Sequence, residues 1–157
     1  MTPELSIVIV NFNGRGHLDA CLRSLEAHPP AVPSETIVVD NASTDGSAAV
    51  VAGFPAVRLL QLEKNVGFSA GNNAGIRATS GRFVLLLNND TVVAAGAIDR
   101  LLARLAADPA AAAAGPRLVD GDGVAELSFG PMISPLGELR QKIVVALHGR
   151  QFAPVSL

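Results

Sequence analysis

The sequence predicts an α/β fold in which a mostly parallel sheet is flanked by helices. Residues 5–10 and 83–87 form near-continuous apolar runs, which are typical of strands covered on both faces. Two further strand candidates, 36–39 and 57–62, lie between them and are separated by stretches with helical periodicity. The repeated order of strand and helix favours parallel strands joined by right-handed crossovers.

Four helices are expected between and after these strands, at 16–28, 47–52, 68–79 and 95–107. The first has an apolar face at three- and four-residue spacing, formed by Leu18, Cys21, Leu22 and Leu25. Ser43 or Asp45 is placed to cap the second helix. Beyond residue 110 the pattern weakens, and residues 136–147 fit an amphipathic helix or a strand equally well.

The composition excludes several classes of protein. The chain has 157 residues, about one domain, with 12 Lys and Arg against 14 Asp and Glu and a net charge of −2. This balance, with only 4% aromatic residues, offers neither the basic stripe nor the stacking platform of nucleic-acid binders. Cys21 is the single cysteine, so we expect no intrachain disulfide and a small buried side chain there. No stretch suits a signal peptide or a membrane span, so a soluble chain is expected.

Polar residues gather where the predicted strands stop, which is the edge at which parallel sheets bind ligands. Asn11 and Asn13 follow the first strand candidate, and Asp40 and Asn41 follow the second. Asp40 can accept a hydrogen bond from a base N–H or a ribose hydroxyl, and Asn11 or Asn13 can offer both a donor and an acceptor. Together they predict a nucleoside pocket. Residues 40–46 also have the composition of a plain turn with a helix cap.

A segment rich in glycine and asparagine, residues 65–75, lies between the third and fourth strand candidates. Its Gly67, Gly71 and Gly75 share one helical face, so a tightly packed helix accounts for the pattern as well as a binding segment does. The dinucleotide fingerprint needs G-x-G-x-x-G directly after the first strand, which this chain lacks. A hydride-transfer enzyme is therefore disfavoured.

Asn88, Asn89 and Asp90 follow the apolar run at 83–87, so a carboxylate and two amides emerge at the same edge. Such oxygen donors suit Mg²⁺ or Mn²⁺ held between one or two protein ligands and the phosphates of a substrate. Asp90 is the predicted protein ligand of the metal.

Four sequence blocks, in order, carry a resemblance to a known family: residues 6–14 (SIVIVNFNG), 38–47 (VVDNASTDGS), 65–76 (NVGFSAGNNAGI) and 85–91 (LLLNNDT). In these blocks the chain resembles the family 2 glycosyltransferases, in particular the rhamnosyltransferase-like members. The resemblance implies a Rossmann-like GT-A fold that binds a nucleotide-diphosphate sugar. It implies a nucleotide-sugar-binding subdomain at 1–115 and the start of an acceptor-side region, incomplete, at 116–157.

The predicted nucleotide-sugar-binding residues lie in all four blocks, and Asp90 is added as the metal ligand. They are Val10, Asn11, Asn13, Asp40, Asn41, Asn65, Gly67, Asn72, Asn73, Asn88 and Asn89. Asn88 to Asp90 lie where the family carries its D-x-D motif, so Asn88 replaces the first Asp and one negative charge is missing. Asn72 stands where many relatives carry Arg, which removes a phosphate contact.

The implied reaction is attack of an acceptor hydroxyl on the anomeric carbon with inversion, while a metal neutralises charge on the leaving diphosphate. A base must take the hydroxyl proton. In the family it lies in the second half, so no residue here is assigned as catalytic, and the chain is expected to hold the donor site only. The implied setting is cell-envelope polysaccharide synthesis in bacteria, in the cytoplasm or at the inner face of the plasma membrane.

The expected partners are a nucleotide-diphosphate sugar and a glycan or lipid-linked saccharide acceptor, with peripheral membrane association and a homo-oligomer left open. Two other functions also stay open. One is a non-catalytic nucleotide-binding module that works with a partner chain. The other is a sugar-phosphate nucleotidyltransferase, which would want a Gly-rich basic loop after the first strand, where residues 11–16 offer only Arg15 with scattered glycines.

Overall fold

A computed structural model describes residues 2–120 of the chain, which divides into two units, Met1–Ala114 and Gly115–Leu157. All the helices and strands described below belong to the first unit. Of the predicted acceptor-side region at 116–157, residues 121–157 lie outside the described residues, as does the segment 136–147. The functional division of the chain into these two parts stays a prediction.

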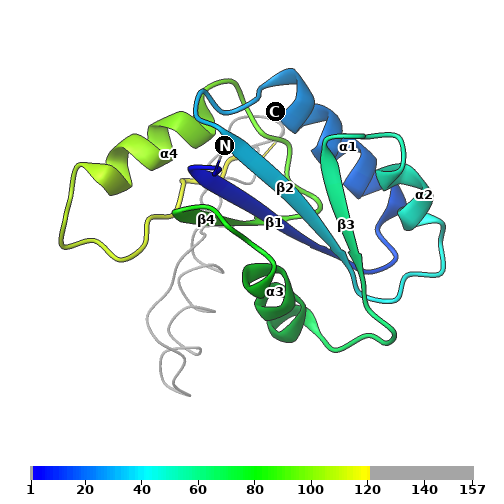
Figure 1. Ribbon diagram of the computed structural model, residues 1–157. Coiled ribbons are helices and arrows are strands. Elements are labelled where there is room, and N and C mark those ends of the chain that lie inside the picture. Colours follow the sequence, from blue (N-terminus) through cyan, green and yellow to red (C-terminus); the bar gives the residue numbers. More distant parts are fainter. Residues whose placement is uncertain (1, 121–157) are drawn as a thin grey trace, which may run out of the picture. The chain divides into compact units, whose positions relative to one another are not determined.

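The described unit alternates strands and helices along the chain (Figure 1). The strands are β1 (Leu5–Asn11), β2 (Ser34–Asp40), β3 (Val57–Gln61) and β4 (Phe83–Asn88). The helices are α1 (Arg15–Ala27), α2 (Ser47–Val51), α3 (Phe68–Arg77) and α4 (Ala97–Ala106). Each of the four strands and four helices predicted before residue 110 is present, with ends that differ from the predicted ones by up to two residues.

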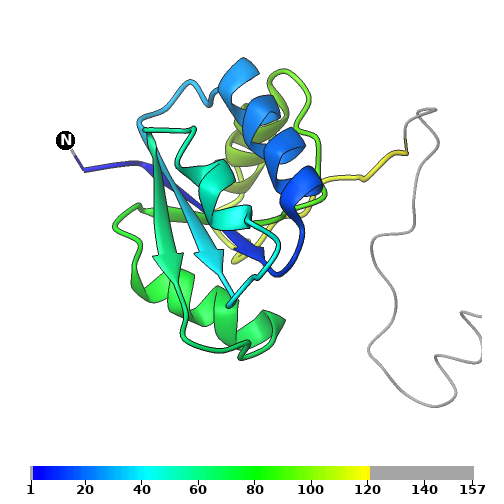
Figure 2. The ribbon, with the colours of Figure 1, turned by 90° about the vertical axis from the view of Figure 1, so that its right-hand side faces the viewer.

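The strands form one parallel sheet in the order β3-β2-β1-β4. Helices α1, α2 and α4 lie on one face of this sheet and α3 lies on the other (Figures 1 and 2). β1 is buried along its whole length because it has a strand on each side and helices on both faces. The prediction of a mostly parallel sheet flanked by helices is confirmed.

Two apolar clusters hold the layers together. The larger one joins β1 and β2 to α1, α2 and α4, and the smaller one lies on the α3 side around Val8, Val10, Ile37 and Val39. Gly71 and Gly75 let α3 approach the sheet closely, since a Cβ at Gly75 would lie 2.3 Å from Val8 Cγ1. The apolar face predicted for the first helix is confirmed, and Cys21 is buried within it.

One prediction about β4 is wrong for the described residues. Both faces of residues 83–87 were expected to be covered, yet Val84 and Leu86 are 41% and 50% exposed. The alternate side chains of β4 pack on the face of the sheet that α1 and α4 cover. On the opposite face, α3 packs across β1 and β2, so Val84 and Leu86 stay open among the described residues. An apolar run alone does not show how many faces are covered.

The cap of α2 also differs from the prediction. The residue before the helix is Gly46, in the left-handed region at φ 85°, rather than Ser43 or Asp45. Asp45 nevertheless accepts a hydrogen bond from the Ser47 backbone N–H at 3.0 Å. The pKa of Asp45 lies below its usual range, mainly because the Ser47 hydroxyl donates a hydrogen bond to the carboxylate. Backbone N–H groups, including that of Arg15, lower the pKa further.

Candidate functional site

The carboxyl ends of three strands meet at one edge of the sheet. Asn11 is in register with Asp40 of β2, and Val10 is in register with Asn88 of β4. Because β2 follows β1 on one side while β4 lies on the other, the connections diverge here, which is where open α/β sheets form their ligand crevice. The polar residues predicted from three separate motifs are thus brought together.

Asn11 is at the centre of this group and is fully buried. Its Nδ2 donates to Ser43 Oγ at 3.2 Å, and its Oδ1 accepts from Asn89 Nδ2 at 2.7 Å. Gly14 makes this packing feasible, because a Cβ there would lie 2.3 Å from Asn89 Nδ2 and 2.8 Å from Asn11 Oδ1. Both polar atoms of the Asn11 side chain are therefore used within the protein, so its visible role is to align the loops after β1, β2 and β4.

Asp40 is different, because one of its oxygens has no partner. The residue is 3% exposed, and its Oδ2 accepts a hydrogen bond from the Ser43 backbone N–H at 3.3 Å. Oδ1 is the only buried side-chain nitrogen or oxygen among the described residues that lacks a hydrogen-bond partner. Leaving a buried acceptor unpaired costs about 1–3 kcal/mol. Such a cost is expected where a ligand supplies the missing donor.

The loops after β1 and β2 are tied to each other around Asn13. Its backbone N–H donates to Ser43 Oγ at 3.0 Å, and its Oδ1 accepts from the Thr44 N–H at 2.8 Å. The Arg15 backbone N–H donates to Asp45 Oδ2 at 2.8 Å and also joins these two loops. Asn13 and Ala42 both have left-handed backbone angles, with φ of 51° and 64°. For Ala42 that conformation costs about 1–2 kcal/mol, so strain is held at this edge of the sheet.

Asn41 connects β2 to the loop before α3. Its Nδ2 donates to Asn65 Oδ1 at 2.9 Å, and its Oδ1 accepts from the Val66 N–H at 2.9 Å. Asn65 Oδ1 also accepts from the Gly67 N–H at 2.9 Å, and Gly67 has a φ of 84° that favours glycine. These predicted site residues therefore shape a loop beside the carboxyl end of β2.

Helix α3 contributes less to the crevice than its sequence suggested. Asn72 is 7% exposed and its Nδ2 donates to the Phe68 carbonyl at 3.2 Å, whereas Asn73 is exposed. Gly71 and Gly75 face the sheet, so close helix packing accounts for them. Gly67 precedes the helix and is required by its backbone angle instead.

Asn88 and Asp90 are exposed on either side of Asn89 at the end of β4. The Cys21 thiol contacts the Asn88 carbonyl at 3.7 Å, and burial, with Asp90 adding to it, raises the pKa of Cys21 to about 11. The described residues contain no group of three His, Cys, Asp or Glu side chains suited to a metal. The donor set is one carboxylate with neighbouring amide oxygens, which fits a divalent cation only if a ligand such as a diphosphate completes its coordination.

Two residues that the structure places in these loops, Ser43 and Phe12, were not among the site residues predicted from the sequence. Ser43 joins Asn11, Asn13 and Asp40, and only its place in the block after β2 could have indicated it. Phe12 lies between Asn11 and Asn13, and its side chain is 48% exposed. An aromatic residue between two asparagines at a strand end was the available signal.

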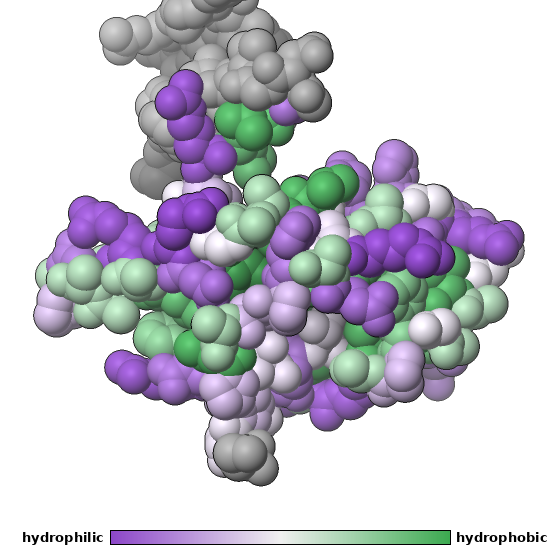
Figure 3. Space-filling view, turned by 90° about the horizontal axis from the view of Figure 1, so that it is seen from above, coloured by the Kyte–Doolittle hydropathy of each residue, from purple (hydrophilic) through white to green (hydrophobic). Residues whose placement is uncertain are grey.

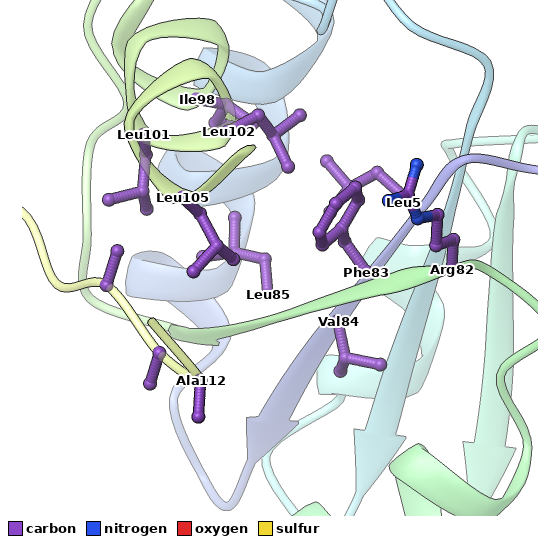
Figure 4. A pocket seen from close by; sticks show the side chains of 12 residues that line it. Leu5, Arg82, Phe83, Val84, Leu85, Ile98, Leu101, Leu102, Leu105 and Ala112 are labelled. Atoms are coloured by element: carbon purple, nitrogen blue, oxygen red, sulfur yellow. The ribbon is translucent and has the colours of Figure 1, made fainter. Parts of the chain in front are cut away.

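A cavity of about 320 Å³ lies elsewhere, between α4 and the beginning of β4 (Figure 4). Ile98, Leu101, Leu102 and Leu105 of α4 line it together with Phe83 and Leu85, and Arg82 is its one charged residue. It lies at the amino ends of the strands and lacks the convergent polar groups of a nucleotide site. Seen from above Figure 1, polar and apolar residues are interspersed over the surface (Figure 3).

Comparison with known proteins gives related sequences. The family model for glycosyl transferase family 2 matches residues 6–148. The chain is 33% identical over 135 residues to the N-acetylglucosaminyl-diphospho-decaprenol L-rhamnosyltransferase of Mycobacterium tuberculosis, covering 78% of this chain and 44% of that protein. It is 34% identical over 106 residues to the succinoglycan biosynthesis protein ExoO of Rhizobium meliloti, covering 65% of this chain and 30% of that protein.

Solved structures give the same fold. The mannosyltransferase PcManGT from Pyrobaculum calidifontis, solved with GDP-Man and Mn²⁺, aligns with a TM-score of 0.62 at 24% identity over 69% of this chain and 34% of its own. S. aureus TarS aligns with a TM-score of 0.60 at 23% identity over 66% of this chain and 32% of its own. The GT-A fold implied by the sequence resemblance is thus confirmed.

The described part of the chain has no helix with the length and apolar character needed to cross a membrane. The chain spans only 30 to 44% of the length of the first curated relatives it matches. The family match nevertheless covers most of this chain, and it includes every predicted site residue. The chain therefore belongs to glycosyl transferase family 2.

Proposed function

We propose that the crevice at the carboxyl ends of β1, β2 and β4 is the donor site for a nucleotide-diphosphate sugar. The observation that carries this proposal is the buried Asp40 Oδ1, which has no hydrogen-bond partner within the protein. A base N–H or a ribose hydroxyl would supply the missing donor. The exposed ring of Phe12, beside Asn11 and Asn13, offers a face on which the base can stack.

The diphosphate end of the donor is proposed to lie at Asn88, Asn89 and Asp90. Asp90 would hold Mg²⁺ or Mn²⁺, with the diphosphate oxygens as further ligands. When bound, the metal stabilises the negative charge that develops on the leaving diphosphate. Asn89 is fixed by Asn11, so the strand end that carries Asp90 is aligned with the nucleoside side of the crevice.

The proposed reaction transfers a hexosyl group, with inversion, to a hydroxyl of a glycan or lipid-linked saccharide. The names of the rhamnosyltransferase and mannosyltransferase relatives support a hexose donor, and those of the rhamnosyltransferase and ExoO support a role in cell-envelope polysaccharide synthesis. We place this work in the cytoplasm, at the inner face of the plasma membrane where a lipid-linked acceptor is found. The site residues described here bind and orient the donor, and no base is assigned.

The test is calorimetric titration of the chain with UDP, dTDP and GDP, each with and without Mn²⁺. One diphosphate is expected to bind, and to bind more tightly with Mn²⁺. Asp40→Ala should weaken its binding about tenfold to a hundredfold, the range for a lost hydrogen bond to a charged group. Asp90→Ala should retain binding but lose the gain from Mn²⁺.

The matched control is Asp19→Ala, since Asp19 pairs with Arg23 on the outer surface of α1. This variant should bind as the wild type does. A folded wild-type chain that binds none of the three diphosphates would falsify the donor-site proposal. If Asp90→Ala kept the full gain in affinity from Mn²⁺, Asp90 would not be the metal ligand.

A second candidate is a nucleotide-binding module that acts with a partner chain or with a second copy of itself. Val84 and Leu86 favour it, because they leave apolar surface on β4 open among the described residues. The discriminating measurement is sugar transfer from the bound donor to water or to an added saccharide. A module of this kind binds the diphosphate but transfers sugar only when the partner is added.

A further inference from the structure

Ser43 connects the end of β1 to the carboxylate of Asp40. Its Oγ accepts hydrogen bonds from Asn11 Nδ2 at 3.2 Å and from the Asn13 N–H at 3.0 Å. Its own backbone N–H donates to Asp40 Oδ2 at 3.3 Å. The same residue is therefore anchored by β1 and in turn holds one oxygen of the carboxylate.

The hydroxyl is a saturated acceptor, because an oxygen of this kind has two lone pairs and both face a donor. Alanine at position 43 would leave the Asn11 amide and the Asn13 N–H without an acceptor. It would also release the neighbouring Ala42, whose φ of 64° is a conformation that side chains other than glycine rarely adopt. Without the hydroxyl, the loop keeps the Thr44 N–H to Asn13 Oδ1 bond, but residue 43 itself loses both of its side-chain contacts to the end of β1.

These contacts join the carboxyl ends of three strands. Asn89 Nδ2 donates to Asn11 Oδ1, and Asn11 Nδ2 donates to Ser43 Oγ. A continuous series of hydrogen bonds thus runs from the end of β4, beside Asp90, to the carboxylate at the end of β2. Ser43 is the residue that connects these side-chain hydrogen bonds to Asp40.

We propose that Ser43 is a positioning residue of the nucleotide site. The Ser43 hydroxyl fixes the loop, and the Ser43 backbone N–H then holds Asp40 Oδ2. The other oxygen of the carboxylate, Asp40 Oδ1, is left to accept a hydrogen bond from the ligand. The inference rests on the proposed donor site and adds to it the residue that orients its buried carboxylate. Ser43 acts through Asp40 and takes no part in the chemistry of transfer.

The experiment is a double-mutant cycle between Ser43→Ala and Asp40→Asn, with Kd measured calorimetrically for UDP, dTDP and GDP in the presence of Mn²⁺. Ser43→Ala should weaken binding about fivefold to tenfold, as expected for a lost hydrogen bond. In the Asp40→Asn background the same change should have no further effect, because the carboxylate that it orients is gone. Ser43→Thr, which keeps the hydroxyl, should restore most of the affinity.

Ser80→Ala is the matched control, because the Ser80 hydroxyl donates to Glu35 at 2.9 Å and Glu35 also binds Ser6, near the amino ends of the strands. It removes a serine hydrogen bond of similar length and should leave every Kd unchanged, even if the melting temperature falls. If Ser43→Ala does not fold, Ser43→Cys keeps the size of the side chain with a weaker acceptor and should weaken binding in the same direction.

The outcomes separate the two proposals. Wild-type affinity in folded Ser43→Ala, or losses that add fully in the double variant, would overturn the positioning role while leaving the donor site standing. A wild-type chain that binds none of the diphosphates contradicts the donor site, and the role of Ser43 in it as well.

Discussion

At the scale of single residues, the proposed binding role of Asp40 and the stability of the chain oppose each other. A buried carboxylate oxygen without a donor lowers the stability of the ligand-free chain, but it is the feature that a nucleotide can use. Asp40→Asn removes the buried charge while it keeps the shape of the side chain. We expect it to raise the free energy of unfolding by about 1 kcal/mol, measured by urea denaturation without ligand.

Nucleotide affinity should fall in the same variant. Asp45→Asn provides the contrast, because Asp45 accepts hydrogen bonds from Ser47 and Arg15 and its pKa is lowered by them. That substitution should destabilise the chain at pH 7, where the carboxylate is ionised. Equal stability losses in both variants would mean that the Asp40 carboxylate is satisfied in the ligand-free protein.

Cys21 predicts a pH dependence at alkaline pH. Burial, and secondarily Asp90, raises its pKa from 9.0 to about 11, so the folded chain keeps the thiol proton that the unfolded chain loses. The stability due to the neutral thiol is complete below pH 9.0 and is lost as pH rises toward 11. The loss is on the order of 2–3 kcal/mol. Urea denaturation between pH 8 and 10.5 measures most of this loss, and Cys21→Ala should lack this component.

The sequence predicted where the asparagine residues of the candidate site lie in the fold, but not which atoms they contact. An asparagine amide has a donor and an acceptor, so the sequence alone left Asn11 and Asn13 as candidates for a base edge and Asn41 as a nucleotide-sugar-binding residue. In the structure both amide atoms of Asn11 and Asn41 are used within the protein. Hydrogen bonds between residues 78 positions apart, such as that of Asn89 with Asn11, have no local sequence signal.

At the scale of elements, the approach of α3 to the sheet depends on two glycines. A Cβ at position 75 would lie 2.3 Å from Val8 Cγ1 and 3.0 Å from Val39 Cγ2, both in the rigid core. Gly75→Ala should therefore push α3 away and cost about 1–3 kcal/mol, despite the better helix propensity of alanine. Thermal unfolding followed by circular dichroism measures the loss.

Gly16→Ala in α1 is the comparison, since a Cβ there meets nothing within 4 Å. That variant should be neutral or stabilised by up to about 1 kcal/mol. If the two substitutions had the same effect, close packing of α3 would not be the reason for Gly75, and a binding role for the glycine would need to be considered.

Helices and strands were predicted well because their signals are local. Helical spacing in α1 and the apolar runs of β1 and β4 each extend over a few neighbouring residues. The order of the strands and the uncovered face of β4 depend on which elements meet in space. Leu86 is apolar whether a helix covers it or not, so its exposure could be found only from the structure.

At the scale of the whole molecule, the open face of β4 gives a test of what surrounds the described unit. Leu22 is 1% exposed and Leu86 is 50% exposed. Leu22→Ala should cost about 2–5 kcal/mol, the usual range for a core leucine. Leu86→Ala should cost well under half as much if its surface is open, and urea denaturation of both variants measures the difference.

The comparison uses the same chemical change at both positions, so burial is the largest difference between them, beside the smaller one between helix and strand propensity. Equal costs would mean that another part of the chain, outside residues 2–120, or a second copy covers β4. Repeating the measurement over a range of protein concentrations separates these cases, since only cover by a second copy depends on concentration.

The central place of β1 also has a consequence for how the protein is made. β1 pairs with β2 on one side and with β4 on the other, and β4 begins only at Phe83. During synthesis, β1, β2 and β3 leave the ribosome before β4 does, so a growing chain presents one bare edge of the strand that is fully buried in the finished fold. Ser43 and Asp40 can already be in place at that stage. The hydrogen bond from Asn89 to Asn11 can form only after β4 emerges, so a nascent chain gains its proposed donor site at a defined length.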